Sequence, residues 1–290
     1  MSTTTDVPRR TVGPFKSQLL KWIGNKQRFA HEIVSLFPQE IRTYYEPFVG
    51  SGAVLGTLAP KRGVAGDALG PLIEIWSTLV EDHEEVIRWY SERWERTQKV
   101  GKKNAFEEIR SSYNRNPNGA DLLFISRSCY GGVLRFRERD GAISTPCGAH
   151  EPVSPDSFRS RALNWFQRVR STKFFHEDFE VVIDQSKRGD VVYCDPPYSD
   201  TQSILYGAQR FSLDRLLNSI DRAKSRGVFV ALSIDGSKRS GAHHVSNPFP
   251  PDLFEREVSV NVGRSMLRRF QMKGETLENE HVRDRLLLTV

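Results

Sequence analysis

The chain has 290 residues, with 42 Lys or Arg against 36 Asp or Glu, so its formal net charge at pH 7 is +6. This length suits one catalytic domain with an insertion, and no apolar stretch is long enough to span a bilayer, so we expect no membrane partner. The three cysteines lack paired spacing and predict neither a disulfide framework nor a zinc site, which indicates a cytoplasmic protein that uses no metal.

The first predicted elements are a strand, a glycine turn and a helix. Residues 1–14 are polar with Pro and Gly, and we expect them to form a flexible tail. A short strand over 43–48 leads into the turn Gly50-Ser51-Gly52, and an apolar stretch follows over 53–58. Glycines at such a turn let the backbone approach a nucleotide-like ligand, although ordinary strand-to-helix turns also contain them.

A second short apolar run, 64–66, ends in Asp67. An acid at the tip of the second strand of an open α/β sheet can accept hydrogen bonds from ribose hydroxyls, although its distance from the turn is shorter here than in the dinucleotide fingerprint. The turn and the acid together predict a cofactor that carries an adenosine.

The middle segment, 83–165, differs from the rest of the chain in its pattern of charged and apolar residues. Residues 84–96 and 105–112 have helical spacing, and 126–141 alternates arginines with apolar and aromatic residues before an Asp-Gly turn. That alternation predicts a β-hairpin that presents basic side chains to DNA, or a solvated hairpin that contacts only phosphates. The candidate DNA contacts are Arg127, Tyr130, Arg135, Arg137 and Arg139.

The apolar run 191–194 is followed by Asp195-Pro196-Pro197-Tyr198, which predicts methylation of an exocyclic amine. Such an amine is a poor nucleophile because its lone pair is delocalised into the ring, so a site must hold it with hydrogen-bond acceptors. Asp195 supplies a carboxylate and Pro196 a carbonyl in a stiff turn, while Tyr198 offers a face on which an extruded base can stack. The alternative is a Pro-rich turn after a buried strand.

The remaining elements continue the sheet. A loop over 199–211 precedes a helix at 213–224, and strands are expected at 227–233, 254–260 and 286–290. In that loop, Tyr206 and Phe211 could pack against the target or anchor the loop.

The expected fold class is α/β, with a doubly wound, mostly parallel, Rossmann-like sheet, an antiparallel strand near its C-terminal edge and helices on both faces. The catalytic domain would comprise 15–82 and 166–290, and a largely helical recognition subdomain carrying the hairpin would occupy 83–165.

Five motifs occur in a telling order: 21–26, 46–52, Asp67, 176–179 and 195–198. In this order the chain resembles the Dam-like adenine-N6 DNA methyltransferases, from about Lys16 to the C-terminus. The resemblance implies double-stranded DNA as partner, S-adenosylmethionine as methyl donor, a flipped base held by Asp195, Pro196 and Tyr198, and a base-reading role for Arg135. The implied cofactor residues are Trp22, Lys26, Glu46, Phe48, Gly50, Gly52, Asp67, Asp178, Phe179 and Asp195.

The chain departs from the family pattern in the hairpin, where Gly131 replaces an asparagine and 141–148 lacks the usual aromatic bulk. The family's best-known target, GATC, therefore cannot be transferred. Two alternatives stay open here: methylation of cytosine N4 or of RNA, and a non-catalytic DNA-binding module. The intact Asp195, Asp67 and glycine turn favour an active enzyme. We expect a monomer or weak dimer, with a cognate restriction or defence protein as a possible partner.

Overall fold

The structure, a computed structural model, describes residues 10–197, 211–234, 249–250, 252–263 and 282–290. Tyr198 and Tyr206 lie outside these residues, so the roles expected for them stay predictions. None of the helices in the described ranges is long and apolar enough to cross a membrane.

A seven-stranded sheet forms the centre of the fold, in the order β3-β2-β1-β4-β5-β7-β6. The first five strands in space are parallel and β7 is antiparallel to both neighbours, which confirms the mostly parallel sheet and its antiparallel strand. The strands are β1 (Tyr44–Glu46), β2 (Gly63–Asp67), β3 (Thr172–His176), β4 (Val191–Cys194), β5 (Phe229–Ile234), β6 (Arg256–Gly263) and β7 (Val282–Leu288).

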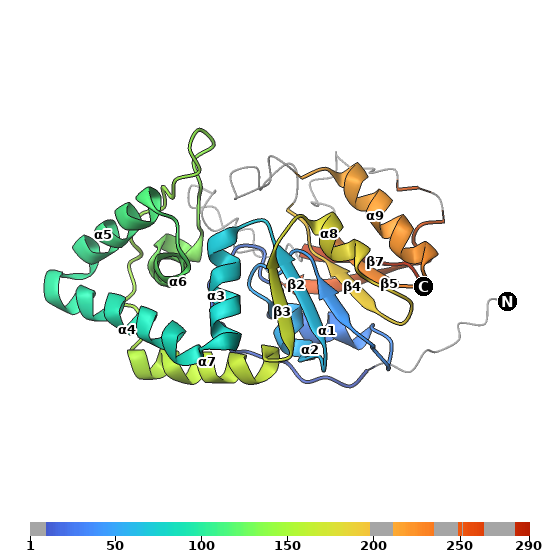
Figure 1. The fold of residues 1–290 in the computed structure, drawn as a ribbon, viewed down its shortest axis with the longest axis horizontal. Helices are drawn as coiled ribbons and strands as arrows, with labels where there is room; N and C mark the ends of the chain where they lie inside the picture. The colour runs from blue at the N-terminus through green and yellow to red at the C-terminus, as the bar shows by residue number, and fades with distance from the viewer. Residues whose placement is uncertain (1–9, 198–210, 235–248, 251, 264–281) are drawn as a thin grey trace.

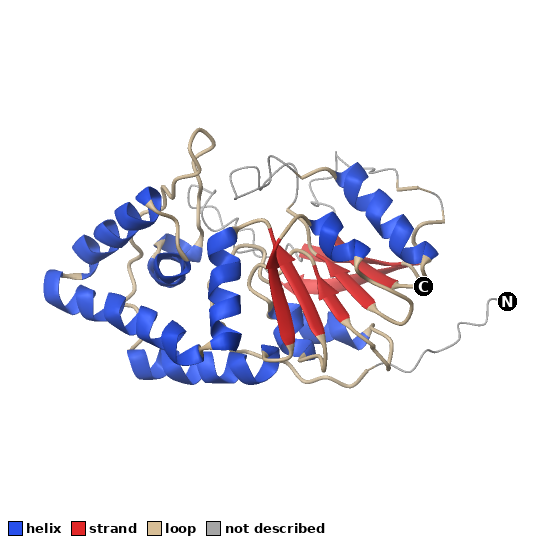
Figure 2. Ribbon diagram, viewed as in Figure 1, coloured by secondary structure: helices blue, strands red, loops and turns tan. Residues whose placement is uncertain are grey.

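Helices cover both faces of the sheet, as expected for a doubly wound fold (Figures 1 and 2). Alternate residues of β4 show the two faces: Val191 and Tyr193 belong to one buried cluster, whereas Val192 and Cys194 belong to the other. The first cluster includes residues of α1 (Ala30–Ser35), α2 (Ala53–Leu58) and α3 (Gly70–Glu81), and the second includes residues of α8 (Phe179–Asp184) and α9 (Leu213–Ser225).

A helical body lies beside the β3 edge of the sheet, with α3 at the junction (Figure 2). Side chains cap three of its helices: Asp82, Asn118 and Ser154 each accept a hydrogen bond from a backbone N–H of the first turn. The body consists of α4 (His83–Val100), α5 (Lys102–Arg115), α6 (Gly119–Ser128) and α7 (Pro155–Val169). The boundary expected after residue 165 falls inside α7, which continues toward the sheet.

The basic segment differs from the predicted hairpin in where it begins. Residues 126–128 complete α6, and a 3-10 turn at Tyr130–Gly132 follows. The chain then runs out and back over 133–147, with isolated antiparallel bridges at Cys129–Cys147 and Phe136–Ile143 in place of two continuous strands. We call residues 133–147 the hairpin; it projects toward the side of the molecule where the parallel strands end (Figure 1).

The N-terminal segment is held more firmly than a flexible tail would be. The backbone N–H of Arg10 donates to the carbonyl of Ser35 at 3.1 Å, and its guanidinium donates to the carbonyl of Pro38 at 2.7 Å. The flexible tail expected over 1–14 is therefore wrong at Arg10, while residues 1–9 lie outside the described residues.

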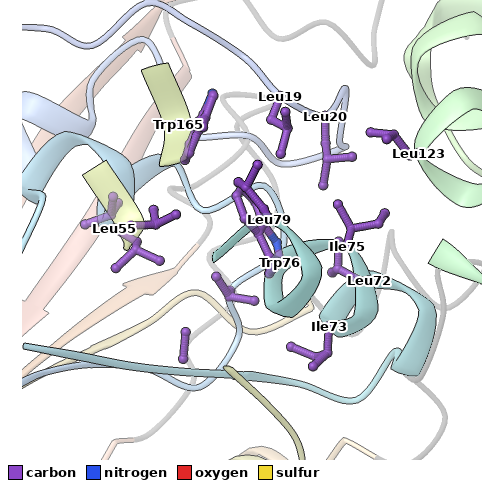
Figure 3. Packing of buried hydrophobic residues seen from close by; sticks show 14 of the residues in the cluster. Leu19, Leu20, Leu55, Leu72, Ile73, Ile75, Trp76, Leu79, Leu123 and Trp165 are labelled. Atoms are coloured by element: carbon purple, nitrogen blue, oxygen red, sulfur yellow. The ribbon is translucent and has the colours of Figure 1, made fainter. Parts of the chain in front are cut away.

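Two tryptophans join the helical body to the sheet. Trp76 of α3 and Trp165 of α7 are fully buried, with ring centroids 5.2 Å apart (Figure 3). A β-carbon added to Gly56 in α2 would lie 2.5 Å from the Trp165 ring. The absence of a side chain at Gly56 is thus what lets α7 pack this closely against α2.

We predict that Gly56→Ala destabilises the protein by about 1–3 kcal/mol, because the new methyl group overpacks a buried ring. A loss of stability would be informative, since alanine in a helix interior is otherwise favoured over glycine by about 1 kcal/mol. Urea unfolding measures the change. Gly13→Ala is the control, since nothing lies within 4 Å of a β-carbon placed there. Wild-type stability of Gly56→Ala would mean that Trp165 moves aside freely.

Candidate active site

The strand order reverses between β1 and β4, and an open cavity lies there, with about 1020 Å³ of space including its mouth. In open α/β sheets such a switch point is where ligands bind. The cavity brings together most of the residues predicted for the site: Trp22, Lys26, Glu46, Phe48, Gly50, Asp67, Asp178, Phe179, Asp195 and Pro196. Gly52 does not line it but caps α2.

The turn after β1 depends on its glycines and on Asp67. Gly50 and Gly52 have φ values of +46° and +64°, in the left-handed region that favours glycine. The N–H of Gly50 donates to Asp67 Oδ2 at 3.1 Å, and the N–H of Leu69 donates to Asp67 Oδ1 at 3.1 Å. Asp67 therefore connects the ends of β1 and β2. Trp22 lies over the turn: a β-carbon on Gly50 would be 3.3 Å from its ring.

An ion pair lies at the end of β4. Lys26 Nζ is 3.1 Å from Asp195 Oδ1, and the two side chains are only 6% and 19% exposed. A charge pair this far from water interacts more strongly than one on the surface. Lys26 thus compensates the charge of Asp195.

A second carboxyl group, that of Glu46, lies at the end of the neighbouring strand. Its side chain is buried, and the hydroxyl of Tyr44 donates to Glu46 Oε2 at 2.5 Å. Burial raises the pKa of Glu46 to about 8, with a further contribution from the charge of Asp195, although the Tyr44 hydrogen bond acts in the opposite direction. Glu46 is therefore largely protonated at neutral pH, and the pair of carboxyl groups carries about one negative charge.

Three aromatic rings lie together in the wall of the cavity, and we call this part its aromatic end. Phe48 stacks on Phe179 with centroids 5.2 Å apart, and Phe211 packs against both at 5.9 Å. Phe211, whose role the sequence left open, thus belongs to the cavity wall. Asp178 caps α8, since its Oδ1 accepts a hydrogen bond from the N–H of Glu180 at 3.0 Å.

Sequence reasoning missed one further participant, Tyr44, and left the role of Phe211 open. The contact of Tyr44 with Glu46 could have been found from their spacing, because residues i and i+2 share one face of a strand. Phe211 carried no comparable signal, since only the fold brings the start of α9 to the end of β1.

Buried apolar side chains and exposed arginines alternate along the first half of the hairpin. Leu134 and Phe136 are buried, whereas Arg135, Arg137 and Arg139 are exposed. Arg137 Nη2 lies 2.9 Å and Arg139 Nε 3.3 Å from Asp140 Oδ2. Arg135 makes no ion pair with the described residues. At the root of the hairpin, the side chain of Tyr130 is 51% exposed.

The hairpin is attached to α5 through its own main chain. Asn114 Oδ1 accepts from the N–H of Ile143 at 2.7 Å, and its Nδ2 donates to the carbonyl of Ile143 at 3.1 Å. Arg110 Nη1 donates to the carbonyl of Thr145 at 3.0 Å. These hydrogen bonds attach the returning half of the hairpin to the helical body.

Arg127 has a different position from the one predicted. It is buried in α6, and its Nη1 donates to the carbonyls of Gln18 and Leu19, both at 2.9 Å. Its guanidinium therefore attaches the N-terminal segment to the helical body, and we remove it from the candidate DNA contacts.

Comparison with known proteins gives a consistent result. A family model described as D12 class N6 adenine-specific DNA methyltransferase matches residues 22–256. The chain is 27% identical over 233 residues to the type II methyltransferase M1.LlaDCHI of Lactococcus lactis subsp. cremoris, covering 75% of this chain and 80% of that protein. It is 26% identical over 258 residues to the DNA adenine methylase of Haemophilus influenzae, covering 83% and 87%.

A third relative is much longer. The DNA N-6-adenine-methyltransferase of Escherichia phage P1 is 27% identical over 248 residues, and the match covers 80% of this chain but 32% of that protein.

The raised pKa of Glu46 predicts a pH dependence of stability. An unfolded carboxyl group ionises near 4.5, whereas the folded protein holds this proton until about pH 8. Its contribution is thus complete below pH 4.5 and is lost as the pH rises to 8, at roughly 1.4 kcal/mol per pH unit. Urea unfolding at pH 5, 6, 7 and 8 should show the wild type losing this stability relative to Glu46→Gln. Parallel pH profiles for the two proteins would place the pKa of Glu46 near its ordinary value.

Proposed function

The chain belongs to the D12 class of N6 adenine-specific DNA methyltransferases, and from that membership we propose that it methylates the N6 amine of an adenine flipped out of a specific duplex sequence. The observation that carries this proposal is the position of Asp195 and Pro196 at the switch point, beside Lys26 and Glu46.

The cavity has the chemistry that S-adenosylmethionine requires. We propose that Phe48 and Phe179 pack against its adenine, that Asp178 accepts a hydrogen bond from the adenine amino group, and that Asp67 accepts from the ribose hydroxyls. The turn at Gly50 lets the backbone approach the ligand closely. When bound, the cofactor supplies a methyl group activated by its sulfonium charge. Trp22 and the ionised form of Glu46 complete the proposed cofactor site, and Gly52 acts on it through the turn, where its N–H donates to the carbonyl of Val49.

Asp195 and Pro196 act on the target base in this proposal. The carboxylate of Asp195 and the carbonyl of Pro196 accept hydrogen bonds from the N6 amine and draw its lone pair out of the ring plane, toward the methyl donor. Such acceptors contribute most where charge develops in the transition state and water is excluded. Lys26 orients the Asp195 carboxylate through their 3.1 Å contact. Tyr198 is proposed to stack on the flipped base.

The helical body supplies the proposed DNA recognition unit, residues 83–165, between the catalytic parts 15–82 and 166–290. The exposed arginines of the hairpin favour contact with the duplex, and the exposed ring of Tyr130 can stack against bases near the extruded one. Arg137 and Arg139, which both pair with Asp140, are proposed to contact phosphates. Arg135 is the candidate for reading a guanine edge, because an arginine fork can bind O6 and N7 bidentately.

The biological setting is also a proposal. One relative is named a type II methyltransferase, and another a DNA adenine methylase. We propose that this chain modifies host DNA as a monomer or weak dimer, alongside a cognate restriction or defence protein.

Asp195→Ala should reduce methyl transfer about 100-fold or more, because it removes a charge-assisted acceptor from the reacting amine. Incorporation of labelled methyl groups into duplex DNA, followed by nucleoside analysis, measures the rate and should identify N6-methyladenine as the wild-type product. Asp221→Ala is the control, an exposed acid on α9. Turnover at the wild-type rate in Asp195→Ala would contradict the mechanism, and N4-methylcytosine as product would contradict the base assignment.

Arg135→Ala should cost about 1–3 kcal/mol of discrimination at one position of the target sequence. Arg139→Ala is the matched variant: it removes an exposed arginine of the same hairpin and should weaken binding almost uniformly across sequences. Methylation of a randomised duplex library compares the two profiles. If Arg135→Ala keeps the wild-type sequence profile, Arg135 does not read a base.

A further inference from the structure

One side chain of α9 contacts three consecutive residues at the aromatic end of the cavity. Arg215 Nη2 lies 3.0 Å from Asp178 Oδ1 and 2.6 Å from Glu180 Oε2, while Arg215 Nε donates to Glu180 Oε2 at 3.2 Å. Its guanidinium carbon also lies 5.1 Å from the centroid of the Phe179 ring. The guanidinium thus spans the residue that caps α8 and the first turn of that helix.

These contacts fix the orientation of the Asp178 carboxylate. Its Oδ1 accepts from the N–H of Glu180 at 3.0 Å and from Arg215 at the same distance. Within the described ranges, both hydrogen bonds to this carboxylate are on Oδ1, so Oδ2 keeps its acceptor capacity. Asp178 lines the cavity, and its direction is set by two donors on one oxygen.

Glu180 holds the guanidinium in place from the other side. Its Oε2 receives two N–H groups of Arg215, and its Oε1 accepts from the hydroxyl of the fully buried Ser219 at 3.4 Å. A planar guanidinium gripped in this way loses less freedom for each contact it makes than a lysine would. Arg215 therefore has a defined position from which to orient Asp178.

We propose that Arg215 is a positioning residue that makes the cofactor site select a 6-aminopurine over a 6-oxopurine. This rests on the proposed function, which places Asp178 at the adenine amino group. A carboxylate offers only acceptors, so it matches an amino group and opposes a carbonyl oxygen. The discrimination is large only if the acceptor points at position 6 of the ring, and Arg215 sets that direction.

A matched control lies on the same helix. Arg222 pairs with Asp184 at 3.0 Å with a side chain 45% exposed, against 42% for Arg215, and it approaches Glu180 no closer than 4.0 Å. Ion pairs at this exposure contribute little to stability, so both Arg215→Gln and Arg222→Gln should fold. A change in ligand selection found only in the first variant therefore reports the position of the arginine.

Calorimetry of the full-length protein without DNA would measure affinity for S-adenosylhomocysteine and for its 6-oxo analogue. The wild type should prefer the amino form, and Arg215→Gln should reduce that preference about 10-fold, as expected when a hydrogen bond to a charged group is misdirected. Arg215→Lys should show a preference between those of the wild type and Arg215→Gln, since lysine keeps the charge but lacks the planar guanidinium. Arg222→Gln should keep the wild-type ratio, and Asp178→Asn should abolish it.

The outcomes separate this proposal from the cofactor assignment beneath it. A wild-type ratio in Arg215→Gln together with a lost ratio in Asp178→Asn would overturn the role of Arg215 and leave Asp178 at the adenine. An equal loss of affinity for both ligands in Arg215→Gln would also overturn it, because that is the effect of a merely structural residue. A wild-type ratio in Asp178→Asn would overturn both.

Discussion

The reversal of strand order between β1 and β4 is the constraint on which the site depends. Parallel strands end at the same edge of a sheet, and connections that leave in opposite directions from two neighbouring strands open a crevice between them. The positions of Glu46 and Asp195 in the crevice follow from this order, because each residue lies at the carboxyl end of one of the two strands. Lys26 then reaches the same crevice from the N-terminal segment.

The crevice also brings two acidic side chains close together, and their repulsion is relieved by a proton, a hydroxyl group and an ammonium group. Two carboxylates at the ends of adjacent strands would repel each other in a site shielded from water. Glu46 holds a proton and a hydrogen bond from Tyr44, whereas Asp195 faces the ammonium of Lys26. The charges of these three groups thus nearly cancel, and a positively charged ligand beside them would favour loss of the Glu46 proton.

Sequence patterns predicted the sheet best at the strands that carry the residues of the site. The ends of β1, β2 and β4 carry turns and acids that are visible in the printed sequence, but β3 was not predicted as a strand. α6 is buried over its whole length, so it lacks the exposed polar face that produces helical periodicity, and the pattern at residues 126–128 predicts a strand where the helix ends. Arg127 and Arg215 show the other limit: an arginine in a sequence does not reveal whether carbonyls, carboxylates or DNA will surround it.

The attachment of the hairpin to α5 bears on how such an enzyme can acquire a new target. Asn114 and Arg110 bond to main-chain atoms of Ile143 and Thr145, and every amino acid offers a carbonyl there. This attachment therefore sets few requirements on the side chains at the tip, where residues 137–141 are exposed. In the recognition role proposed for the hairpin, mutations at the tip would alter the sequence that is read while the scaffold keeps its stability, so specificity would diverge among descendants faster than the catalytic fold.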